Sequence, residues 1–259
     1  MAVYYLAKAQ RDLGRSAESR RGMQNVADSR GRLAPAARCG LAHLARLAGD
    51  FPAAHMVVSD LGWPGRHHRV DGDIWWPHGD MSRAAIAYKA ARTEAEQHGV
   101  AGERATSQGQ RAFTDPDCGT DEIELARHLL SGLTLRQTGH TIDMAALVRD
   151  AGTDRSVLDR AHVLGEEIRV SGVAIATAIL EFVVCFHQTV LGDDQGITDT
   201  MTRLRALTEG GDYAYYTDIA AFMADRPVPQ SSARWIEDEA TVRRRWRRLV
   251  LTRYARLQS

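Results

Sequence analysis

The sequence has few of the residues that mark disulfide-rich, zinc-binding or strongly charged proteins. Its three cysteines, Cys39, Cys118 and Cys185, lie far apart and form no Cys-x-x-Cys pair, so neither a disulfide framework nor a structural zinc site is predicted. A reducing cytoplasm is the expected location. The 33 basic residues are balanced by 33 acidic ones, which argues against a surface that binds nucleic acid or membranes as a whole.

Long apolar runs and strand patterns are also missing. The most apolar stretch, residues 173–191, is interrupted by Glu181, His187 and Gln188. It falls short of the roughly 20 apolar residues that cross a membrane, and we expect a buried helix there. No segment alternates apolar and polar residues between hairpin turns, so strands are not expected. These absences favour an all-α protein that does not span a membrane.

Two Gly-Asp turns are the most informative feature that is present. Gly49 separates two stretches whose apolar residues recur every three or four positions, and Gly79 does the same. Each glycine is followed by an aspartate and then by an apolar residue that begins the second stretch. Glycine adopts a positive φ without a Cβ penalty, so it can end one helix while the chain turns into the next. The pattern predicts antiparallel helix hairpins, which must stack because one hairpin cannot bury its apolar face alone.

The same pattern recurs along the chain with decreasing regularity. Gly14, Gly49 and Gly79 are 35 and 30 residues apart, and Gly139 follows after 60, close to two repeats of about 34 residues, the tetratricopeptide period. A later turn is expected at Gly192. The drift in spacing predicts a degenerate helical repeat.

Five segments carry a family resemblance: Arg38–Ala54, Val70–Pro77, Glu94–Ser107, Met144–Gly152 and Gly211–Ala224. The sequence resembles the tetratricopeptide repeat (TPR) family, and more narrowly the repeat region that follows the nucleotide-binding module in large actinobacterial regulatory ATPases of the STAND type. The resemblance covers most of residues 1–225 and implies a repeat scaffold. No Gly-x-x-x-x-Gly-Lys-Ser/Thr loop is present, so the ATPase function does not carry over.

We therefore predict an all-α fold, an α-solenoid of degenerate TPR-like antiparallel helix hairpins over residues 1–225. Pro227 and Pro229 each remove a backbone donor and bias the preceding residue away from helix. Residues 226–259 are accordingly predicted to hold a proline-containing linker and an arginine-rich capping helix.

The predicted function is non-catalytic binding of a protein or peptide partner, in regulation, by the concave face of the array. The first helix of each hairpin lines the inner curve of such arrays. No cofactor is expected, and no catalytic residue is assigned because the sequence contains no known catalytic motif. The helix phases place five polar side chains on the inner curve: His43, Arg46, Arg127, His128 and Arg136.

A second hypothesis is a small-molecule- or metal-binding protein, with an enzyme of specialised metabolism as one form of it. It rests on a loop, predicted to be irregular, that contains His67, His68, Asp73, Trp75 and His78. Imidazoles and carboxylates are ligands of zinc and of non-haem metals. The spacing differs from paired histidines four residues apart on a helix, so no metal site is assigned. The tryptophans could also line a recess for a ligand.

Two further clusters receive structural interpretations. Tyr213 and Tyr216 are expected to pack between helices, with Tyr215 facing water. The last helix carries arginines around an apolar stripe, which favours a capping helix, although nucleic-acid binding through these arginines stays open as an alternative. These arginines are Arg243, Arg244, Arg245, Arg247, Arg248, Arg253 and Arg256.

Overall fold

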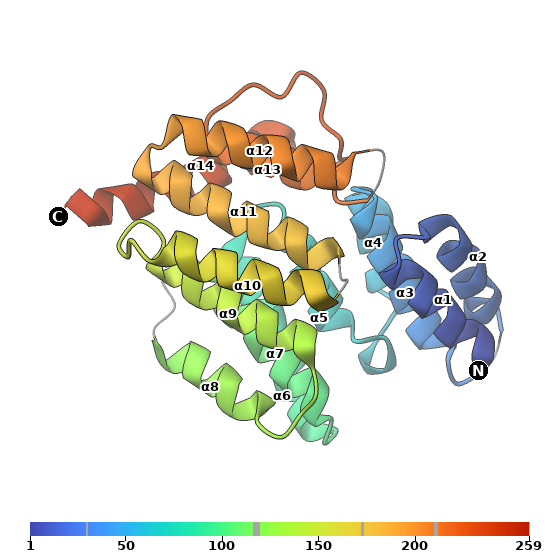
Figure 1. Ribbon diagram of the computed structural model, residues 1–259. Coiled ribbons are helices and arrows are strands. Elements are labelled where there is room, and N and C mark those ends of the chain that lie inside the picture. The colour runs from blue at the N-terminus through green and yellow to red at the C-terminus, as the bar shows by residue number, and fades with distance from the viewer. Residues whose placement is uncertain (30, 116–119, 172–173, 210–211, 259) are drawn as a thin grey trace.

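The computed structural model describes residues 1–259 except 30, 116–119, 172–173, 210–211 and 259. Within that part of the chain the secondary structure is helical and no strand is present, which confirms the all-α prediction (Figure 1). Cys118 lies outside the described residues, as do Val173 and Gly211, which begin the segments 173–191 and 211–224 named above. The elements are α1 (Ala2–Asp12), α2 (Ser16–Ala27), α3 (Ala34–Leu47), α4 (Phe51–Val58), the 3₁₀-helix η1 (Trp63–Gly65), α5 (His67–Trp75), α6 (Met81–Gln97), α7 (Ala101–Thr114), α8 (Thr120–Leu130), α9 (Arg136–Asp150), α10 (Val157–Ser171), α11 (Ala174–Leu191), α12 (Asp194–Thr208), α13 (Tyr215–Met223) and α14 (Glu239–Gln258).

The two Gly-Asp pairs form the helix turns that the sequence predicts. Gly49 (φ 73°) lies between α3 and α4, and Gly79 (φ 67°) lies between α5 and α6. Asp50 and Asp80 then cap the following helix, because a side-chain oxygen of each accepts a hydrogen bond from the backbone N–H three residues further on. The glycine thus ends one helix and the aspartate begins the next.

The predicted turn at Gly139 is wrong. Gly139 lies inside α9, and the chain turns instead at Gly132, where φ is 79°. The buried residues Thr138, Ile142 and Ala145 follow a helical period straight through Gly139, so packing of this face keeps the glycine within the helix.

Most odd-numbered helices pack against the next odd-numbered helix as well as against their neighbours in the chain. Such contacts join α1 to α3, α3 to α5, α7 to α9, α9 to α11 and α11 to α13. Between α5 and α7 the link is an ion pair, with Arg69 Nε 2.5 Å from Glu103 Oε1. We call this succession the odd-numbered row. The even-numbered helices α6 and α12 pack beside it against their chain neighbours.

Residues 67–75 form helix α5, so the prediction of an irregular loop there is wrong. Two prolines flank this helix and lie outside it: Pro64 is in η1, and Pro77 follows α5. Arg66, in the left-handed conformation with φ 58°, separates η1 from α5. Residues 67–75 therefore keep all their backbone donors, and nothing prevents helix formation.

The chain ends by folding back over its own helices. Residues 224–238 contain no helix and appear as the orange-red loop at the top of Figure 1. Helix α14 then packs on α11 and α13, with Val242, Trp246 and Val250 buried along one face. That face is the apolar stripe which the sequence predicts.

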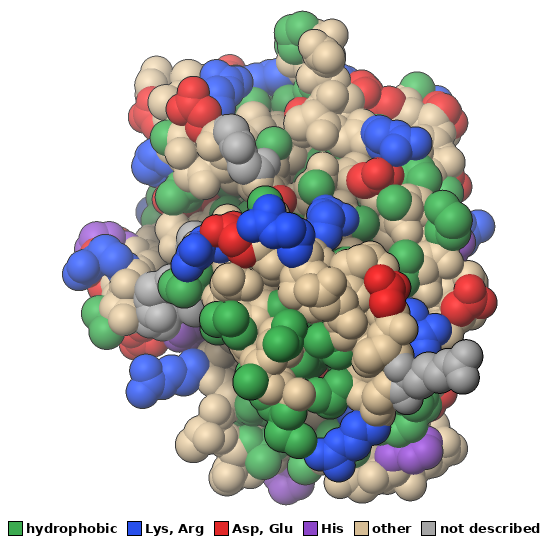
Figure 2. Space-filling view, turned by 90° about the vertical axis from the view of Figure 1, so that its right-hand side faces the viewer, with side chains coloured by type: hydrophobic (Ala, Val, Ile, Leu, Met, Phe, Trp, Pro, Cys, Tyr) green, Lys and Arg blue, Asp and Glu red, His purple; other side chains and the backbone are tan. Residues whose placement is uncertain are grey.

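Apolar surface is concentrated at the N-terminal helix. Figure 2 views the molecule from the side on which α1 and α2 lie and shows hydrophobic side chains gathered there. The exposed apolar residues near the N-terminus are Met1, Val3, Tyr5, Leu6 and Leu13, whose exposed fractions lie between 48% and 72%.

No helix in the described ranges is long and apolar enough to cross a membrane.

Candidate functional site

The α3–α4 turn holds an extended segment from the C-terminal part of the chain. Arg234 N–H donates to Gly49 O (2.8 Å), and Phe51 N–H donates to Arg234 O (3.2 Å). These bonds make an isolated parallel β-bridge between Asp50 and Arg234. A side chain at Gly49 would place Cβ 3.1 Å from Ala233 Cα, so the glycine is needed for this close approach as well as for its positive φ.

Trp235 inserts into an aromatic pocket, which we call the Trp235 pocket and define as Phe51, His78, Tyr215 and Phe222. Its indole stacks on Phe51, with ring centroids 5.1 Å apart and planes 13° apart. His78 meets the indole edge to face at 5.2 Å. The indole Nε1–H donates to Ser231 Oγ (3.0 Å), so the polar edge of the ring is also satisfied.

Asp218 fixes the same segment from helix α13. Its buried carboxylate oxygen Oδ2 accepts hydrogen bonds from Ser232 N (2.8 Å), Ser232 Oγ (2.7 Å) and Ser231 Oγ (3.1 Å). A carboxylate acceptor strengthens each of these bonds relative to a neutral one. Residues 231–236 are therefore bound by backbone, side-chain and aromatic contacts in the manner of an extended peptide.

His78 completes the contact to this segment. Its ring is fully buried, and Nε2 accepts a hydrogen bond from Ile236 N–H (3.0 Å). Nδ1 therefore carries the proton and donates to Ile74 O (2.9 Å). Burial lowers the pKa of His78 to about 4, although the bond to Ile74 acts in the opposite direction. The ring is neutral at pH 7 and has no nitrogen free for a metal.

The α5–α6 turn makes the equivalent contact with helix α14. Arg245 lies 3.5 Å from the Asp80 carboxylate and donates to Glu237 Oε1 at 3.1 Å. Trp246 Nε1–H donates to Pro77 O (2.8 Å). A Cβ on Gly79 would lie 2.9 Å from Arg245 Cβ. Both Gly-Asp turns thus contact the C-terminal region.

Most of the α14 arginines serve contacts within the chain. Arg243 donates to Arg226 O, Arg247 to Met223 O, and Arg253 to Ala151 O. Arg244 donates to Thr241 Oγ1. The bonds of Arg243, Arg247 and Arg253 satisfy carbonyl groups at helix ends and in the connecting segment.

A second group of polar side chains comes from α3, α5, α6 and α7. His43 and Arg46, predicted on the inner curve, lie here beside Asp73, predicted for the alternative loop. Asp73 accepts a hydrogen bond from Tyr88 Oη (2.7 Å) and lies 3.5 Å from the Arg69 guanidinium. We call this group the inner polar cluster, defined as His43, Arg46, Arg69, Asp73, Tyr88 and Glu103.

The charge state of the inner polar cluster follows from its burial. His43 Nδ1 lies 3.9 Å from Asp73 Oδ2, but burial, together with the nearby Arg69 and Arg46, lowers the pKa of His43 well below its ordinary value. His43 is therefore neutral at pH 7, and Arg69 is the cation that faces Asp73. Burial also raises the pKa of Tyr88 well above its ordinary value, and the Asp73 charge acts in the same direction.

Arg46 connects the inner polar cluster to the Trp235 pocket. Its Nη1 donates to Tyr215 Oη at 3.4 Å, and Tyr215 packs against Phe51 with centroids 5.1 Å apart. Nε of Arg46 is buried, and no described residue forms a hydrogen bond with it. Tyr215 is 1% exposed, so the expectation that it faces water is wrong: it is enclosed by α3, α4 and the segment that carries Trp235.

The other predicted partner-binding residues lie apart from this site. Arg127 and His128 are exposed on α8, and Arg136 is exposed at the start of α9. Arg127 pairs with Glu124 (2.8 Å) on its own helix and lies 3.8 Å from Asp143 on α9. Helix α8 packs on α7 and α9 and lies at the edge of the molecule in Figure 1.

The residues of the alternative ligand site also separate. Trp75 donates from Nε1 to Asp71 (3.0 Å) and lies under the Arg83 guanidinium, 4.4 Å from the ring centroid. His67 and His68 begin α5 and face Glu94 on α6, away from Asp73 and His78.

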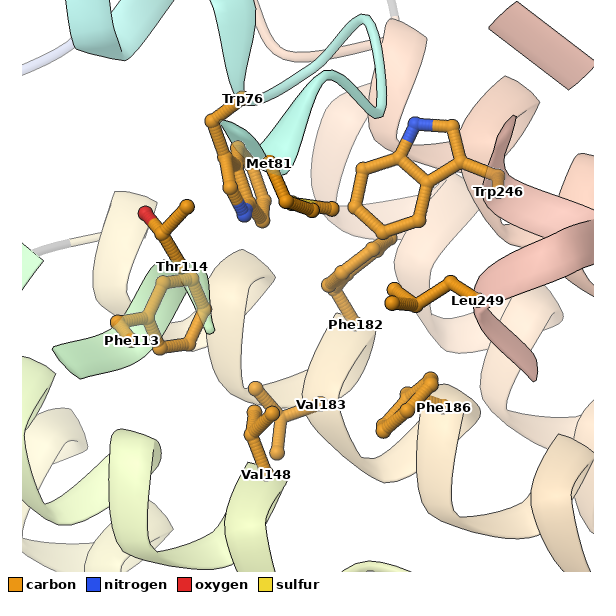
Figure 3. Close-up of a pocket in the computed structure, with 10 residues that line it drawn as sticks. All are labelled: Trp76, Met81, Phe113, Thr114, Val148, Phe182, Val183, Phe186, Trp246 and Leu249. Atoms are coloured by element: carbon orange, nitrogen blue, oxygen red, sulfur yellow. The ribbon is translucent and has the colours of Figure 1, made fainter. Parts of the chain in front are cut away.

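The space beside Trp76 is filled by aromatic side chains. Trp76 and Trp246 meet edge to face at 5.7 Å, and Phe182 packs between them at 5.5 and 5.4 Å (Figure 3). The cavity that remains has a volume of about 20 Å³, room for about one water molecule. This region is an aromatic core and offers no space for a small-molecule substrate.

Fold and site together define an all-helical protein whose two Gly-Asp turns contact its own C-terminal region: the Gly49 turn holds an extended segment, and the Gly79 turn packs on helix α14. Comparison with known proteins adds no relative: no protein-family model, no curated protein and no solved structure matches the chain.

Proposed function

We propose that this protein is a non-catalytic helical-repeat scaffold, an α-solenoid of degenerate TPR-like hairpins, which binds an extended segment of a protein partner in a regulatory role. The repeat interpretation is supported by the Gly-Asp turns at Gly49 and Gly79 and by the packing of most odd-numbered helices on the next one. Such packing is typical of stacked helix hairpins.

The observation that carries the binding function is the way in which residues 231–236 are held. This segment makes main-chain hydrogen bonds to Gly49 and Phe51, anchors Trp235 in an aromatic pocket and places two serines on Asp218. Main-chain bonds supply affinity for an extended peptide, and a side-chain pocket supplies specificity. We infer that the segment occupies the partner site as a resident ligand.

The chemistry of the segment defines the partner that would replace it. The ligand has a tryptophan or similar aromatic anchor, an arginine one residue before it, and small hydroxyl residues three and four positions before it. These positions correspond to Trp235, Arg234, Ser232 and Ser231. The arginine would pair with Asp50, as Arg234 does at 3.1 Å. An aromatic anchor in a desolvated pocket would dominate the affinity.

An enzymatic role receives less support from the same structure. The cavity beside Trp76 is too small for a substrate, and His78 uses both ring nitrogens to hold the backbone. His43 is neutral and buried beside the Tyr88–Asp73 hydrogen bond, so its surroundings favour a structural role over a catalytic one.

The test uses the full chain with its anchor removed. In a Trp235→Ala variant, a labelled peptide of residues 229–238 should bind, measured by fluorescence anisotropy, because the weakened tethered segment no longer competes fully. A matched peptide with alanine at the Trp235 position should bind at least about tenfold more weakly, as expected for loss of a hot-spot aromatic. Circular dichroism checks that the variant remains helical.

A second variant locates the binding surface. Asp218→Asn in the Trp235→Ala background keeps the side-chain shape but removes the charge that receives the two serines, so peptide affinity should fall severalfold. The proposal is overturned if the folded Trp235→Ala variant does not bind the peptide, or if the alanine peptide binds equally well.

A further inference from the structure

Two adjacent histidines and one glutamate converge where α5 begins and α6 ends. His67 and His68 are the first two residues of α5, and Glu94 lies in the last turn of α6. His67 Nδ1 is 4.0 Å from Glu94 Oε2, and His68 Nε2 is 3.7 Å from Glu94 Oε1. One ligand atom from each residue lies within 4.8 Å of the other two. The three residues therefore present two imidazole nitrogens and a carboxylate to one point.

The contacts among these side chains are too long for hydrogen bonds. His67 Nδ1 is buried and has no hydrogen-bond partner among the described residues, although buried polar atoms are satisfied in the great majority of cases. The imidazole rings lie face to face at a tilt, with centroids 3.8 Å apart, which brings both sets of lone pairs near the carboxylate. A cation between the three groups would satisfy all of them.

The neighbouring cationic side chain is directed elsewhere. Arg66 donates to Trp63 O (2.9 Å), stacks over the Trp63 ring at 3.9 Å and lies 3.7 Å from Glu103. The Arg66 guanidinium therefore does not pair with Glu94, whose carboxylate faces the two histidines. The positive N-terminus of α5 disfavours a cation here, whereas the negative C-terminus of α6 favours one. Because the two helix dipoles act in opposite directions, the negative charge of Glu94 makes the site attractive to a cation.

We infer that His67, His68 and Glu94 form a zinc-binding site. Two histidines and a glutamate are a ligand set that zinc accepts with its fourth position left to water. Zinc–ligand distances of about 2.0–2.2 Å place neighbouring ligand atoms roughly 3.3 Å apart in a tetrahedron. The three ligand atoms, which lie within 4.8 Å of one another, must therefore approach each other by up to about 1.5 Å. All three side chains are half-buried at a helix end, where rotamer adjustment of this size is available.

Zinc would join α5 to α6 at the end of the hairpin opposite Gly79. The site differs from the sequence-based cluster, because Asp73 and His78 are engaged elsewhere and Glu94 takes their place. It is independent of the proposed peptide site, which lies at the Gly79 end of the same two helices.

The experiment is zinc titration of the chelator-treated full chain, without an affinity tag, by isothermal calorimetry and thermal unfolding. One zinc ion should bind per chain, and Tm should rise with zinc concentration, since a ligand that binds only the folded state stabilises it. Magnesium should produce no shift, because it prefers oxygen ligands. His68→Ala and Glu94→Gln should each weaken zinc binding by about 100-fold or more, beyond the 10–100-fold cost of outer-shell changes.

His55→Ala is the matched control. His55 lies 3.7 Å from the Asp71 carboxylate, a similar histidine–carboxylate pair that has no third ligand group among the described residues, so zinc affinity should be unchanged in this variant. The inference is overturned if the wild-type chain shows no zinc-dependent heat or Tm shift. It is equally overturned if the response survives in folded His68→Ala and Glu94→Gln variants.

Discussion

Phe51 and Trp235 stack on each other with ring centroids 5.1 Å apart, although 184 residues separate them in the chain. Phe51 is the first residue of α4 and directly follows a Gly-Asp turn, and Trp235 lies in the helix-free segment before α14. The stack ties the second hairpin of the fold to its C-terminal region. The folded state is thereby closed by a contact between distant parts of the sequence.

Removal of the Trp235 side chain should weaken this closure. Trp235→Ala loses the stack on Phe51 and leaves part of the pocket unfilled, so we expect a loss of about 2–3 kcal/mol in the free energy of unfolding, below the 3–5 kcal/mol of fully buried aromatics. Urea unfolding measures it. Trp235→Phe keeps a stacked ring and should recover more than half of the loss; equal effects of the two substitutions would contradict the stacking argument.

Glycine at position 79 should be required for more than its backbone conformation. Gly79→Ala meets the strain of φ 67° and also places Cβ 2.9 Å from Arg245 Cβ, which must displace α14. Gly99 has nearly the same φ, 66°, and a Cβ at that position would have nothing within 4 Å.

The pair Gly79→Ala and Gly99→Ala therefore separates strain from contact. Gly99→Ala should cost about 1 kcal/mol of unfolding free energy from the left-handed backbone alone. Gly79→Ala should cost about 1–3 kcal/mol more, as expected for overpacking. Thermal or urea unfolding of both variants gives the difference, and equal costs would show that α14 does not press on this turn.

Acid should destabilise the fold through His78. The pKa of His78 is about 4 in the folded state and 6.5 in the ordinary state, so between these values the unfolded chain binds a proton that the folded chain does not. The contribution of His78 to the free energy of unfolding is complete above pH 6.5. It falls as the pH drops towards 4, by about 1.4 kcal/mol per pH unit for this one group. His43 acts in the same direction, because burial lowers its pKa as well.

The contribution of His78 can be isolated with a side chain that does not titrate. The amide oxygen of His78→Gln can accept from Ile236 N–H at any pH. Urea unfolding at pH 7 and pH 5 should show a smaller acid-induced loss in the variant than in the wild type, by about 1–2 kcal/mol. The same loss in both proteins would argue against a neutral His78 as the acceptor.

The inner polar cluster should be sensitive to the Tyr88 hydroxyl. Tyr88→Phe removes the 2.7 Å hydrogen bond to the buried Asp73 carboxylate. We expect a loss of about 1.5–3 kcal/mol in unfolding free energy, the range for hydrogen bonds to charged groups. Tyr5→Phe is the control, because Tyr5 is 57% exposed and its substitution should change the unfolding free energy by less than about 0.5 kcal/mol. Similar effects at the two positions would contradict the assigned role of the Tyr88–Asp73 bond.

Local sequence rules predict the turns better than they predict the site. The two Gly-Asp turns and the helical periodicity follow from short-range chemistry, which the sequence displays directly. Gly139 misleads because a glycine pattern alone does not say whether packing will continue a helix through it. Residues 67–75 mislead because their polar composition resembles a loop, while the prolines that would break a helix lie on either side of them.

The candidate site depends on contacts that no local pattern contains. His43 and Arg46 were predictable as polar residues on α3, but Asp218 and Trp235 join the site only when the C-terminal segment folds back. The sequence gives one signal for Trp235, a tryptophan soon after a helix-breaking proline stretch, without indicating where it packs. Glu94 joins His67 and His68 for the same reason, since α6 must first return alongside α5.

By itself, the sequence determined an all-helical chain with hairpin turns at Gly49 and Gly79, because helix periodicity and glycine at positive φ are properties of a few neighbouring residues. Only the tertiary structure decided that Trp235 lies on Phe51, that His78 is a buried acceptor, and that Arg243, Arg247 and Arg253 of α14 donate to the chain's own carbonyl groups. These contacts form only when segments that are distant in the sequence pack together. Burial and hydrogen bonding between those segments then determine which residue each side chain contacts.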